Sequence, residues 1–227
     1  MIRDNSQRAT QAVWFFVLTA VAAGLNMLLG LLDAANPQSV YATAEDELNL
    51  LGLGVFSFAI LYLLIRIASY VFLIRWFRRA YANIARAGEP TQYSDGWAAG
   101  AWFVPIVSFF RPYSMMKEVW RHTQLLAYDA VQTHGLLRAW WLMFVLHLGA
   151  AQVSSRADAA PGSSAYTNLL VLEYSLSIAM AVLTVVVIRR VATAEAVLQI
   201  RTKVSNLGEP APSVVVAEDA YTPTLQQ

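Results

Sequence analysis

Four long apolar runs constrain this sequence more than any other feature. They cover residues 10–32, 48–74, 136–153 and 166–188, and each has at least 18 residues. An α-helix rises about 1.5 Å per residue, so about 20 apolar residues cross the roughly 30 Å of hydrocarbon in a bilayer. The runs therefore predict an all-α integral membrane protein with four transmembrane helices.

The composition excludes an ordinary water-soluble domain. Hydrophobic residues make up 57% of the 227 positions and charged residues only 14%, whereas soluble domains carry about 25% charged residues. The formal net charge is +1, so the chain has no overall basic field of the kind that attracts nucleic acid. Because the sequence has no cysteine, thiol nucleophiles, disulfides and thiolate metal sites are excluded too.

A cleavable signal peptide is the alternative interpretation of the first run. Arg3 and Arg8 precede the run, and the small residues Ala34 and Ala35 follow it. The run is longer than the roughly 7–15 residues usual for the apolar part of a signal peptide. We therefore predict a transmembrane helix.

Residues 97–110 form a shorter apolar segment that is predicted not to cross the bilayer. The segment has 14 residues, contains Pro105 and is followed directly by Arg111 and Pro112, which is typical of a re-entrant or interfacial segment. Residues 112–128 then predict an amphipathic helix on the cytoplasmic surface, so the re-entrant or interfacial region covers residues 97–128. We expect Trp120 of this helix to lie at the level of the lipid headgroups. Its apolar side carries Met115, Met116, Val119 and Leu126, and its polar side carries Lys117, Glu118, Arg121 and Gln124.

The sequence also marks the ends of the helical region. The second run continues without Gly or Pro through a basic stretch at residues 75–87 and stops at Gly88 and Pro90, which predicts one long helix that leaves the membrane. Residues 1–203 are predicted to form one membrane domain. Residues 204–227 contain three prolines and little periodic apolar sequence, which predicts a disordered cytoplasmic tail.

The distribution of Lys and Arg predicts the orientation in the membrane. With four spans, 14 of the 16 basic residues lie on one side, Arg156 lies alone on the other, and Arg66 lies within the membrane. If residues 97–110 also crossed, the split would be seven against eight. Because cytoplasmic loops carry the excess of Lys and Arg, we predict cytoplasmic N and C termini and a location in a bacterial inner or plasma membrane.

Three ionisable residues lie within the predicted spans, namely Arg66, His147 and Glu173. Such groups cost about 2.5–3.5 kcal/mol near the centre of a membrane helix, so each is a candidate functional residue. Judged by depth along the helices, Arg66 is predicted to pair with His147, and Glu173 with Asn26. One interpretation is a polar path for a proton or small ion. The other is structural: Arg66 reaches the headgroups, Glu173 is protonated or pairs with a neighbouring helix, and His147 makes one interhelical hydrogen bond.

A basic strip at the end of the second run is a candidate surface for anionic lipid headgroups. It contains Arg75, Arg78, Arg79 and Arg86, and such residues attract anionic lipid by about 1 kcal/mol each. Basic residues also accumulate at the cytoplasmic ends of membrane helices in general, so the strip has a topological explanation as well.

Sequence motifs of enzymes are missing. The chain has no HExxH, GxSxG, GxGxxG or P-loop pattern, and its three histidines do not have the spacing of metal ligands. We therefore expect no catalytic residue, no bound metal and no cofactor.

Two stretches in the middle of the chain resemble a known family. Residues 72–88 carry an aromatic residue with Arg, Ala and Asn at a helix end, and residues 93–120 carry a Trp-Phe-x-Pro core, a second Pro and a Met-x-Glu-x-Trp run. Over about residues 50–190 the chain resembles the bacterial multi-pass membrane family called domain-of-unknown-function family 4328. Asp95 and Ser108 depart from the pattern of that family. The matching positions are Trp76, Arg79, Ala80, Asn83, Gly88, Tyr93, Trp97, Trp102, Phe103, Pro105, Pro112, Met116, Glu118 and Trp120.

The resemblance implies a bundle of membrane helices and supplies no activity, substrate or cofactor. It directs attention to the segment broken by Pro105, which frees backbone carbonyl groups that protein or a watery cavity must cover. We expect Arg79 and Asn83 to be partners of those carbonyl groups and to form one structural unit with residues 97–112.

Three functions are compatible with this sequence, and an intramembrane enzyme is the least favoured of them. The first is a non-enzymatic structural or regulatory membrane protein that binds lipid headgroups or another membrane protein on its basic face. The second is a small transporter or channel that uses Arg66, His147, Glu173 and Asn26, and it favours a homo-oligomer because four spans rarely enclose a pore alone. A water-filled cavity that reaches His147 and Glu173 would favour transport.

Overall fold

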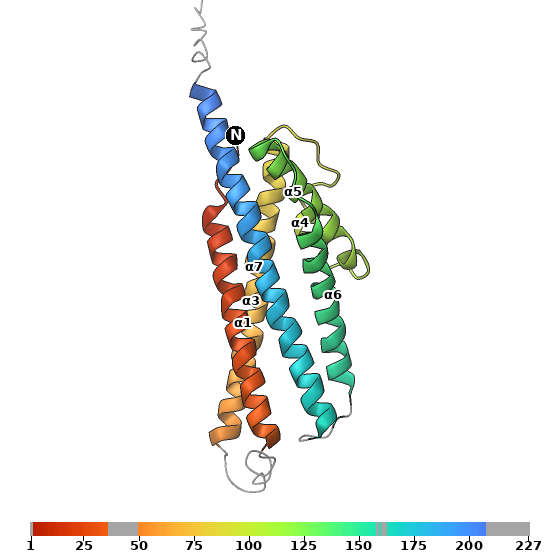
Figure 1. Cartoon of the computed structure of the whole chain (residues 1–227). Coiled ribbons are helices and arrows are strands. Elements are labelled where there is room, and N and C mark those ends of the chain that lie inside the picture. Colours follow the sequence, from red (N-terminus) through yellow and green to blue (C-terminus); the bar gives the residue numbers. More distant parts are fainter. Residues whose placement is uncertain (1, 36–49, 158, 160–162, 208–227) are drawn as a thin grey trace, which may run out of the picture.

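The computed structural model describes residues 2–35, 50–157, 159 and 163–207, and every secondary-structure element in them is a helix (Figure 1). The four long helices are α1 (Ser6–Ala35), α3 (Leu50–Arg86), α6 (Gly135–Arg156) and α7 (Ser164–Leu207). Between α3 and α6 lie α4 (Trp97–Gly100), the 3-10 helix η1 (Val107–Phe109) and α5 (Arg111–Tyr128). The long helices contain the stretches Ser6–Leu32, Ser57–Arg86, Gly135–Arg156 and Ser164–Ser205, each long and apolar enough to cross a membrane. The predicted all-α fold with four membrane-type helices is confirmed.

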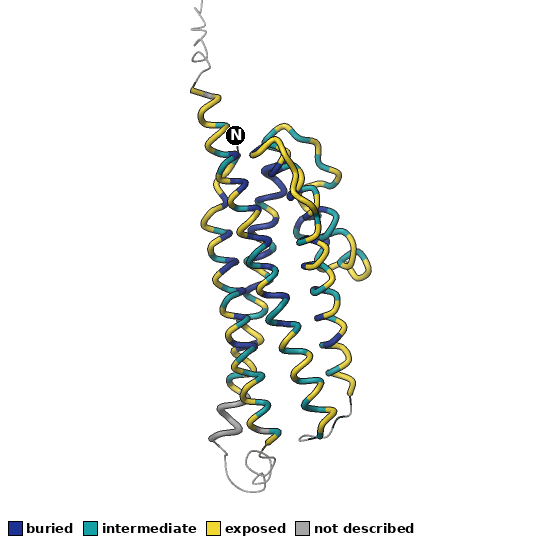
Figure 2. The backbone as a smooth tube through the Cα atoms, in the orientation of Figure 1, coloured by how far each residue is buried: buried dark blue, intermediate teal, exposed yellow. Residues whose placement is uncertain are grey.

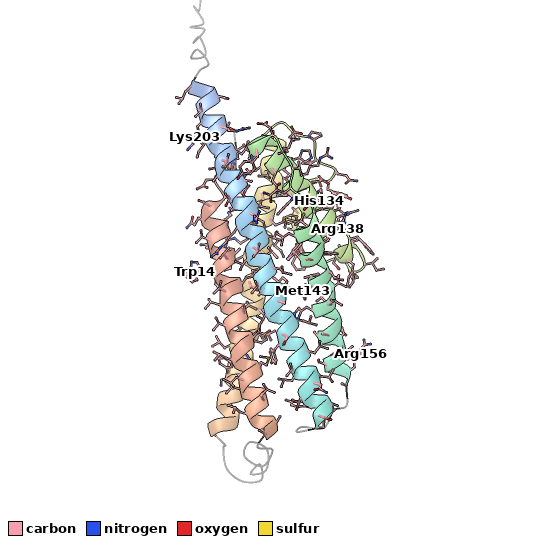
Figure 3. The ribbon with its side chains drawn as sticks, viewed as in Figure 1. Trp14, His134, Arg138, Met143, Arg156 and Lys203 are labelled. Carbon is pink, nitrogen blue, oxygen red and sulfur yellow. The ribbon has the colours of Figure 1, made fainter. Side chains whose placement is uncertain are left out.

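Both described ends of the chain lie at the same end of the bundle (Figure 1). α3 ends there, α6 begins there, and the segment from α4 to α5 lies beside them (Figure 1). Arg138 and Lys203 lie toward this end, whereas Arg156 lies toward the other (Figure 3). We call it the basic end.

Residues 97–110 contain no fifth membrane-type helix. They hold α4, a series of turns and η1, and Ile106 has a left-handed backbone conformation with φ of 66°. The chain then enters α5, which runs back to the basic end (Figure 1).

α3 and α7 are longer than a bilayer is thick. They have 37 and 44 residues, which correspond to about 55 and 66 Å at about 1.5 Å per residue, against roughly 30 Å of hydrocarbon. α7 continues to Leu207, past residue 204 where the disordered tail is predicted to start, and residues 208–227 lie outside the described residues. α1 continues to Ala35, and residues 36–49 of the following loop also lie outside them.

The largest buried side chains gather toward the basic end. Trp76, Phe77 and Tyr81 of α3 and Trp120 of α5 belong to one apolar core with residues of α1, α6 and α7. Figure 2 shows buried residues concentrated toward the basic end, while the other half of the helices is mostly exposed or half-buried. Lipid tails are as apolar as leucine, so a bilayer suits that surface. Exposed apolar side chains on the long helices include Leu18, Leu25, Leu61, Leu64, Leu142 and Leu146.

α5 is amphipathic, but protein covers its apolar side. Met115, Met116 and Val119 are fully buried in the core, where α5 packs against α3 and α7. Trp120 is only 1% exposed and its Nε1 donates a hydrogen bond to the carbonyl oxygen of Gln132 at 3.3 Å, so protein rather than lipid headgroups surrounds its side chain. Gln124, expected on the polar side, is buried as well, and its Oε1 accepts a hydrogen bond from the backbone N–H of Gln132 at 2.8 Å.

α3 ends where the sequence predicts. Gly88 has φ of 91°, its N–H donates to the carbonyl oxygen of Ala85, and the N–H of Glu89 donates to that of Ile84 at 3.2 Å. These bonds close the last turn of the helix, and the positive φ explains the choice of glycine.

Replacing Gly88 by Ala is expected to destabilise the protein by about 1 kcal/mol, because a Cβ atom disfavours the left-handed region. Thermal unfolding in a mild detergent measures the loss. Gly96→Ala is the matched control, since Gly96 has φ of −62° and no atom within 4 Å of an added Cβ. Equal losses in the two variants would contradict the prediction.

Candidate functional site

The predicted pairing of Arg66 with His147 is present in the structure. Nη2 of Arg66 on α3 lies 2.7 Å from Nε2 of His147 on α6, and His147 is only 1% exposed. Because a guanidinium only donates hydrogen bonds, Nε2 must accept, which leaves the imidazole proton on Nδ1. Nδ1 is buried and has no hydrogen-bond partner in the described part of the chain.

A second polar contact lies nearby. The hydroxyl groups of Tyr62 on α3 and Ser177 on α7 are 3.0 Å apart and buried. The guanidinium of Arg66 lies 5.9 Å from the centre of the Tyr62 ring. Polar side chains from α3, α6 and α7 therefore meet among the membrane-type helices.

The structure does not form the other predicted pair. Nδ2 of Asn26 donates to the carbonyl oxygen of Ala22 in its own helix at 2.9 Å. Glu173 is half-buried, and the described residues show no hydrogen bond or ion pair between Glu173 and Asn26.

A buried polar cluster at the basic end joins three parts of the chain. Glu195 of α7 is 4% exposed, and its two carboxylate oxygens accept hydrogen bonds from Asn5 and from Asn83, both at 3.0 Å. Asn83 of α3 also binds the backbone of Arg3, donating to its carbonyl oxygen at 2.9 Å and accepting from its N–H at 3.1 Å. Within the described residues, Glu195 has no ion-pair partner.

Local bonds fix the segment that carries Asn5. The carboxylate of Asp4 accepts a hydrogen bond from the backbone N–H of Ser6 at 2.9 Å and another from the hydroxyl of Ser6 at 3.0 Å. The backbone bond foremost, together with that from the hydroxyl, lowers the pKa of the Asp4 carboxyl. Nδ2 of Asn5 also contacts the carbonyl oxygen of Trp76 at 3.3 Å, which ties the start of the chain to α3.

The expected unit of Arg79, Asn83 and residues 97–112 is not formed in that way. Asn83 binds Arg3 and Glu195, and no hydrogen bond joins Asn83 or Arg79 to the carbonyl groups of residues 97–112 in the described structure. Residues 97–110 are held through aromatic side chains instead. The ring of Trp102 contacts those of Phe77 and Phe144 edge-on at 6.1 and 6.0 Å.

Glu118 holds α5 to the loop that follows α3. Its Oε2 accepts hydrogen bonds from the hydroxyl of Tyr81 at 2.9 Å and from the N–H of Gln92 at 3.1 Å. The hydroxyl of Tyr81 in turn accepts from the N–H of Tyr93 at 3.0 Å. Oε1 of Glu118 is buried and has no partner in the described residues.

The other residues singled out by the sequence pattern take different positions. Trp76 and Pro112 are buried, and Trp102 is half-buried. Pro105 is exposed in the turns before η1, where its carbonyl oxygen accepts from the N–H of Val107 at 2.7 Å. The pattern thus combines core residues, loop contacts and an exposed turn.

The basic strip gains two members from the start of the chain. Arg75 and Arg78 are exposed, while Arg79 and Arg86 are half-buried. Burial foremost, and the positive charges of Arg8 and Arg3 after it, lower the pKa of Arg79. We call Arg3, Arg8 and Arg79 the arginine cluster.

Pockets lie between neighbouring helices in the described part of the chain. One of about 540 Å³ lies between α1 and α7, and one of about 500 Å³ lies between α5 and α7. The third, of about 590 Å³, follows the polar side of α5. The linings of these three pockets do not include Arg66, His147 or Glu173.

Fold and site together define a multi-pass bundle of membrane-type helices with a packed, basic end. The family called domain of unknown function (DUF4328) matches residues 39–193, and the chain belongs to this family. Comparisons with curated proteins and with solved structures give no match.

Proposed function

We propose that the protein is a non-enzymatic membrane protein whose basic end lies at the cytoplasmic face of the plasma membrane and binds anionic lipid headgroups. The arginine cluster is the observation that carries the proposal. Its three side chains come from the segment before α1, from α1 and from α3, and none forms an ion pair within the described residues. An anion among them would relieve their mutual repulsion.

Charged residues indicate where the bilayer lies. Arg138 and Arg156 are 18 residues apart on α6, or about 27 Å, which matches the thickness of the hydrocarbon. Nη1 of Arg8 donates to the carbonyl oxygen of Arg75 at 3.3 Å, so these two residues share one level. A bilayer bounded in this way brings the arginine cluster next to lipid phosphates. The excess of positive charge then favours the cytoplasm for this side.

The turns after α4 support the same placement. Phe103, Ile106 and Phe110 are 75%, 74% and 70% exposed, so water would meet a large apolar surface there. Nε1 of Trp141 donates to the carbonyl oxygen of Phe109 at 3.2 Å, and Trp141 comes one turn after Arg138. We therefore place these turns in the interfacial layer of the bilayer rather than at its centre.

Native mass spectrometry of the protein in a neutral detergent tests the lipid site. In the triple variant R3Q/R8Q/R79Q, the affinity for phosphatidylglycerol is expected to fall about 5-fold per arginine, or about 100-fold in total. R201Q is the control, because Arg201 already binds Asp129 at 3.0 Å. A triple variant that binds phosphatidylglycerol as tightly as the unmodified protein would exclude the proposal.

Orientation is tested separately. A reporter that functions only in the cytoplasm is expected to be active when it is fused after residue 227. Activity of a reporter that works only outside the cytoplasm would reverse the proposed threading.

A polar path for a proton is the second candidate function, and the buried Nδ1 of His147 favours it. This N–H lies among membrane-type helices without a partner in the described residues, so it is available to a water molecule or to a proton acceptor. Proteoliposomes with an enclosed pH-sensitive dye test the path. Proton flux that disappears in H147A would support transport, and equal flux from empty and protein-containing vesicles would exclude it.

A further inference from the structure

The end of α7 carries an apolar stripe that no other described element covers. Ile200, Val204 and Leu207 are 63%, 62% and 85% exposed. α7 extends past the other helices at the basic end, and these residues belong to that extension (Figure 1). We call the three residues the α7 stripe. Neighbouring apolar side chains that are this exposed are typical of an interaction site.

With the bilayer placed as proposed above, lipid does not cover the α7 stripe either. Nε1 of Trp140 on α6 donates to the hydroxyl of Thr184 on α7 at 3.0 Å, so these two residues share one level. Arg138, at the edge of the hydrocarbon, is only about 3 Å of helix from Trp140, whereas Ile200 is about 24 Å of helix past Thr184. The headgroup layer adds only about 5–8 Å on each side of a bilayer. The α7 stripe therefore lies in water.

The α7 stripe has the spacing of a coiled-coil seam. Together with the half-buried Val197, its residues follow one another at intervals of three, four and three, which is the pattern of the a and d positions of a heptad. Val197 and Val204 take the a positions, and Ile200 and Leu207 take the d positions. Valine at both a positions and leucine at the last d position favour two parallel helices.

A second copy of the chain presents the matching stripe. Two copies inserted with the same orientation bring their α7 helices together in parallel, and a twofold axis along the membrane normal sets identical residues opposite each other. Confinement to one bilayer raises the effective concentration of the two stripes, so a short seam is sufficient. We propose that the protein forms a dimer in which the α7 stripes of two copies pack as a parallel coiled coil outside the bilayer.

The charges beside the seam do not oppose this pairing. Arg201 takes an e position, and the g position that it faces in the other copy is Ala196. Lys203 takes a g position and meets no like charge in the sequence, because residue 208, five positions further on, is glycine. Arg189 lies three turns before the α7 stripe on the same helix face. Because each copy carries this charge, the contact is limited to the end of α7.

Cysteine crosslinking of the full chain in isolated membranes tests the dimer. The chain has no cysteine, so a single introduced cysteine reacts at one known position. A disulfide requires Cα atoms within about 7 Å of each other, which the a and d positions of a parallel pair provide. After oxidation with copper phenanthroline, V204C and L207C are expected to give about 10-fold more disulfide-linked dimer than S205C. Ser205 is exposed and takes a b position, away from the seam.

Lysines placed in the seam separate specific packing from chance collision. Adding I200K/L207K to V204C is expected to reduce the crosslinked dimer to the level of S205C, because like charges then face each other in a closed seam. T202K/S205K adds the same charge away from the seam and should leave the crosslink of V204C unchanged. Ile200, Leu207 and Ser205 are exposed and Thr202 is half-buried, so none of these changes opens the core.

Other occupants of the α7 stripe give different results. If residues 208–227 covered the stripe, V204C and L207C would crosslink no more than S205C, and a different protein would give a product that is not twice the mass of the chain. Either result, or a dimer that persists with I200K/L207K, would overturn the proposal. R3Q/R8Q/R79Q should leave the crosslink intact, so failure of the dimer and failure of the lipid site are distinguishable.

Discussion

Replacing Asn83 by Ala is expected to destabilise the folded protein by about 3 kcal/mol. The change removes the hydrogen bond from Nδ2 to the carboxylate of Glu195 and both bonds to the backbone of Arg3. A hydrogen bond to a charged group contributes about 1.5–3 kcal/mol, and the oxygen left behind is a buried acceptor without a donor. Thermal or denaturant unfolding in detergent measures the loss.

Asn26→Ala is the control for this prediction. Asn26 is half-buried, and among the described residues its side chain bonds only to the carbonyl oxygen of Ala22 in its own helix, so the substitution should change stability by about 0.5 kcal/mol or less. In a Glu195→Leu background, Asn83→Ala should cost clearly less, because the charged acceptor is gone. If Asn83→Ala proved as mild as Asn26→Ala, the buried cluster would not stabilise the basic end.

The membrane part of the fold was accessible from the sequence, because a bilayer imposes length and polarity on each crossing helix by itself. The depth of a residue along a membrane helix also follows from the sequence alone, and it predicts that Arg66 and His147 lie at the same level. Depth says nothing about rotation around the helix axis. Glu173 and Asn26 are predicted to lie at matching depths, yet Asn26 bonds within its own helix.

The cluster at the basic end was not predicted, because its members are far apart in sequence. Glu195 comes after Arg189 and Arg190, where an acidic residue beyond the membrane is ordinary. One local signal was present. Ile188, Val191, Glu195 and Leu198 have the spacing of one helix face, and the other three are apolar and buried. A lone carboxylate on such a face indicates polar partners from another helix.

α5 shows a related limit of pattern reasoning. Its apolar side was identified from the positions of Met115, Met116 and Val119. A helix pattern does not show whether lipid or protein covers that side. α3 and α7 are longer than a bilayer is thick, so parts of both helices extend outside it. α5 packs its apolar side against these two helices.

His147→Leu is expected to destabilise the protein by about 3 kcal/mol, more than Arg66→Leu. Without His147 the guanidinium of Arg66 loses its acceptor at 2.7 Å and keeps the neutral hydroxyl of Tyr70 as a partner. A charge that lacks full compensation among membrane helices costs up to about 2.5–3.5 kcal/mol. Arg66→Leu removes the charge itself and leaves only an imidazole without its donor, so we expect a loss of about 1 kcal/mol.

The double variant R66L/H147L separates a structural pair from two independent residues. Removing both partners abolishes the unpaired charge, so the double variant should be about 2 kcal/mol more stable than His147→Leu alone. Thermal unfolding of all four proteins in one detergent gives this coupling, and His134→Leu at the basic end controls for the loss of a histidine. Additive losses would mean that Arg66 reaches another partner or the headgroups in the absence of His147, and that the contact between α3 and α6 adds little to stability.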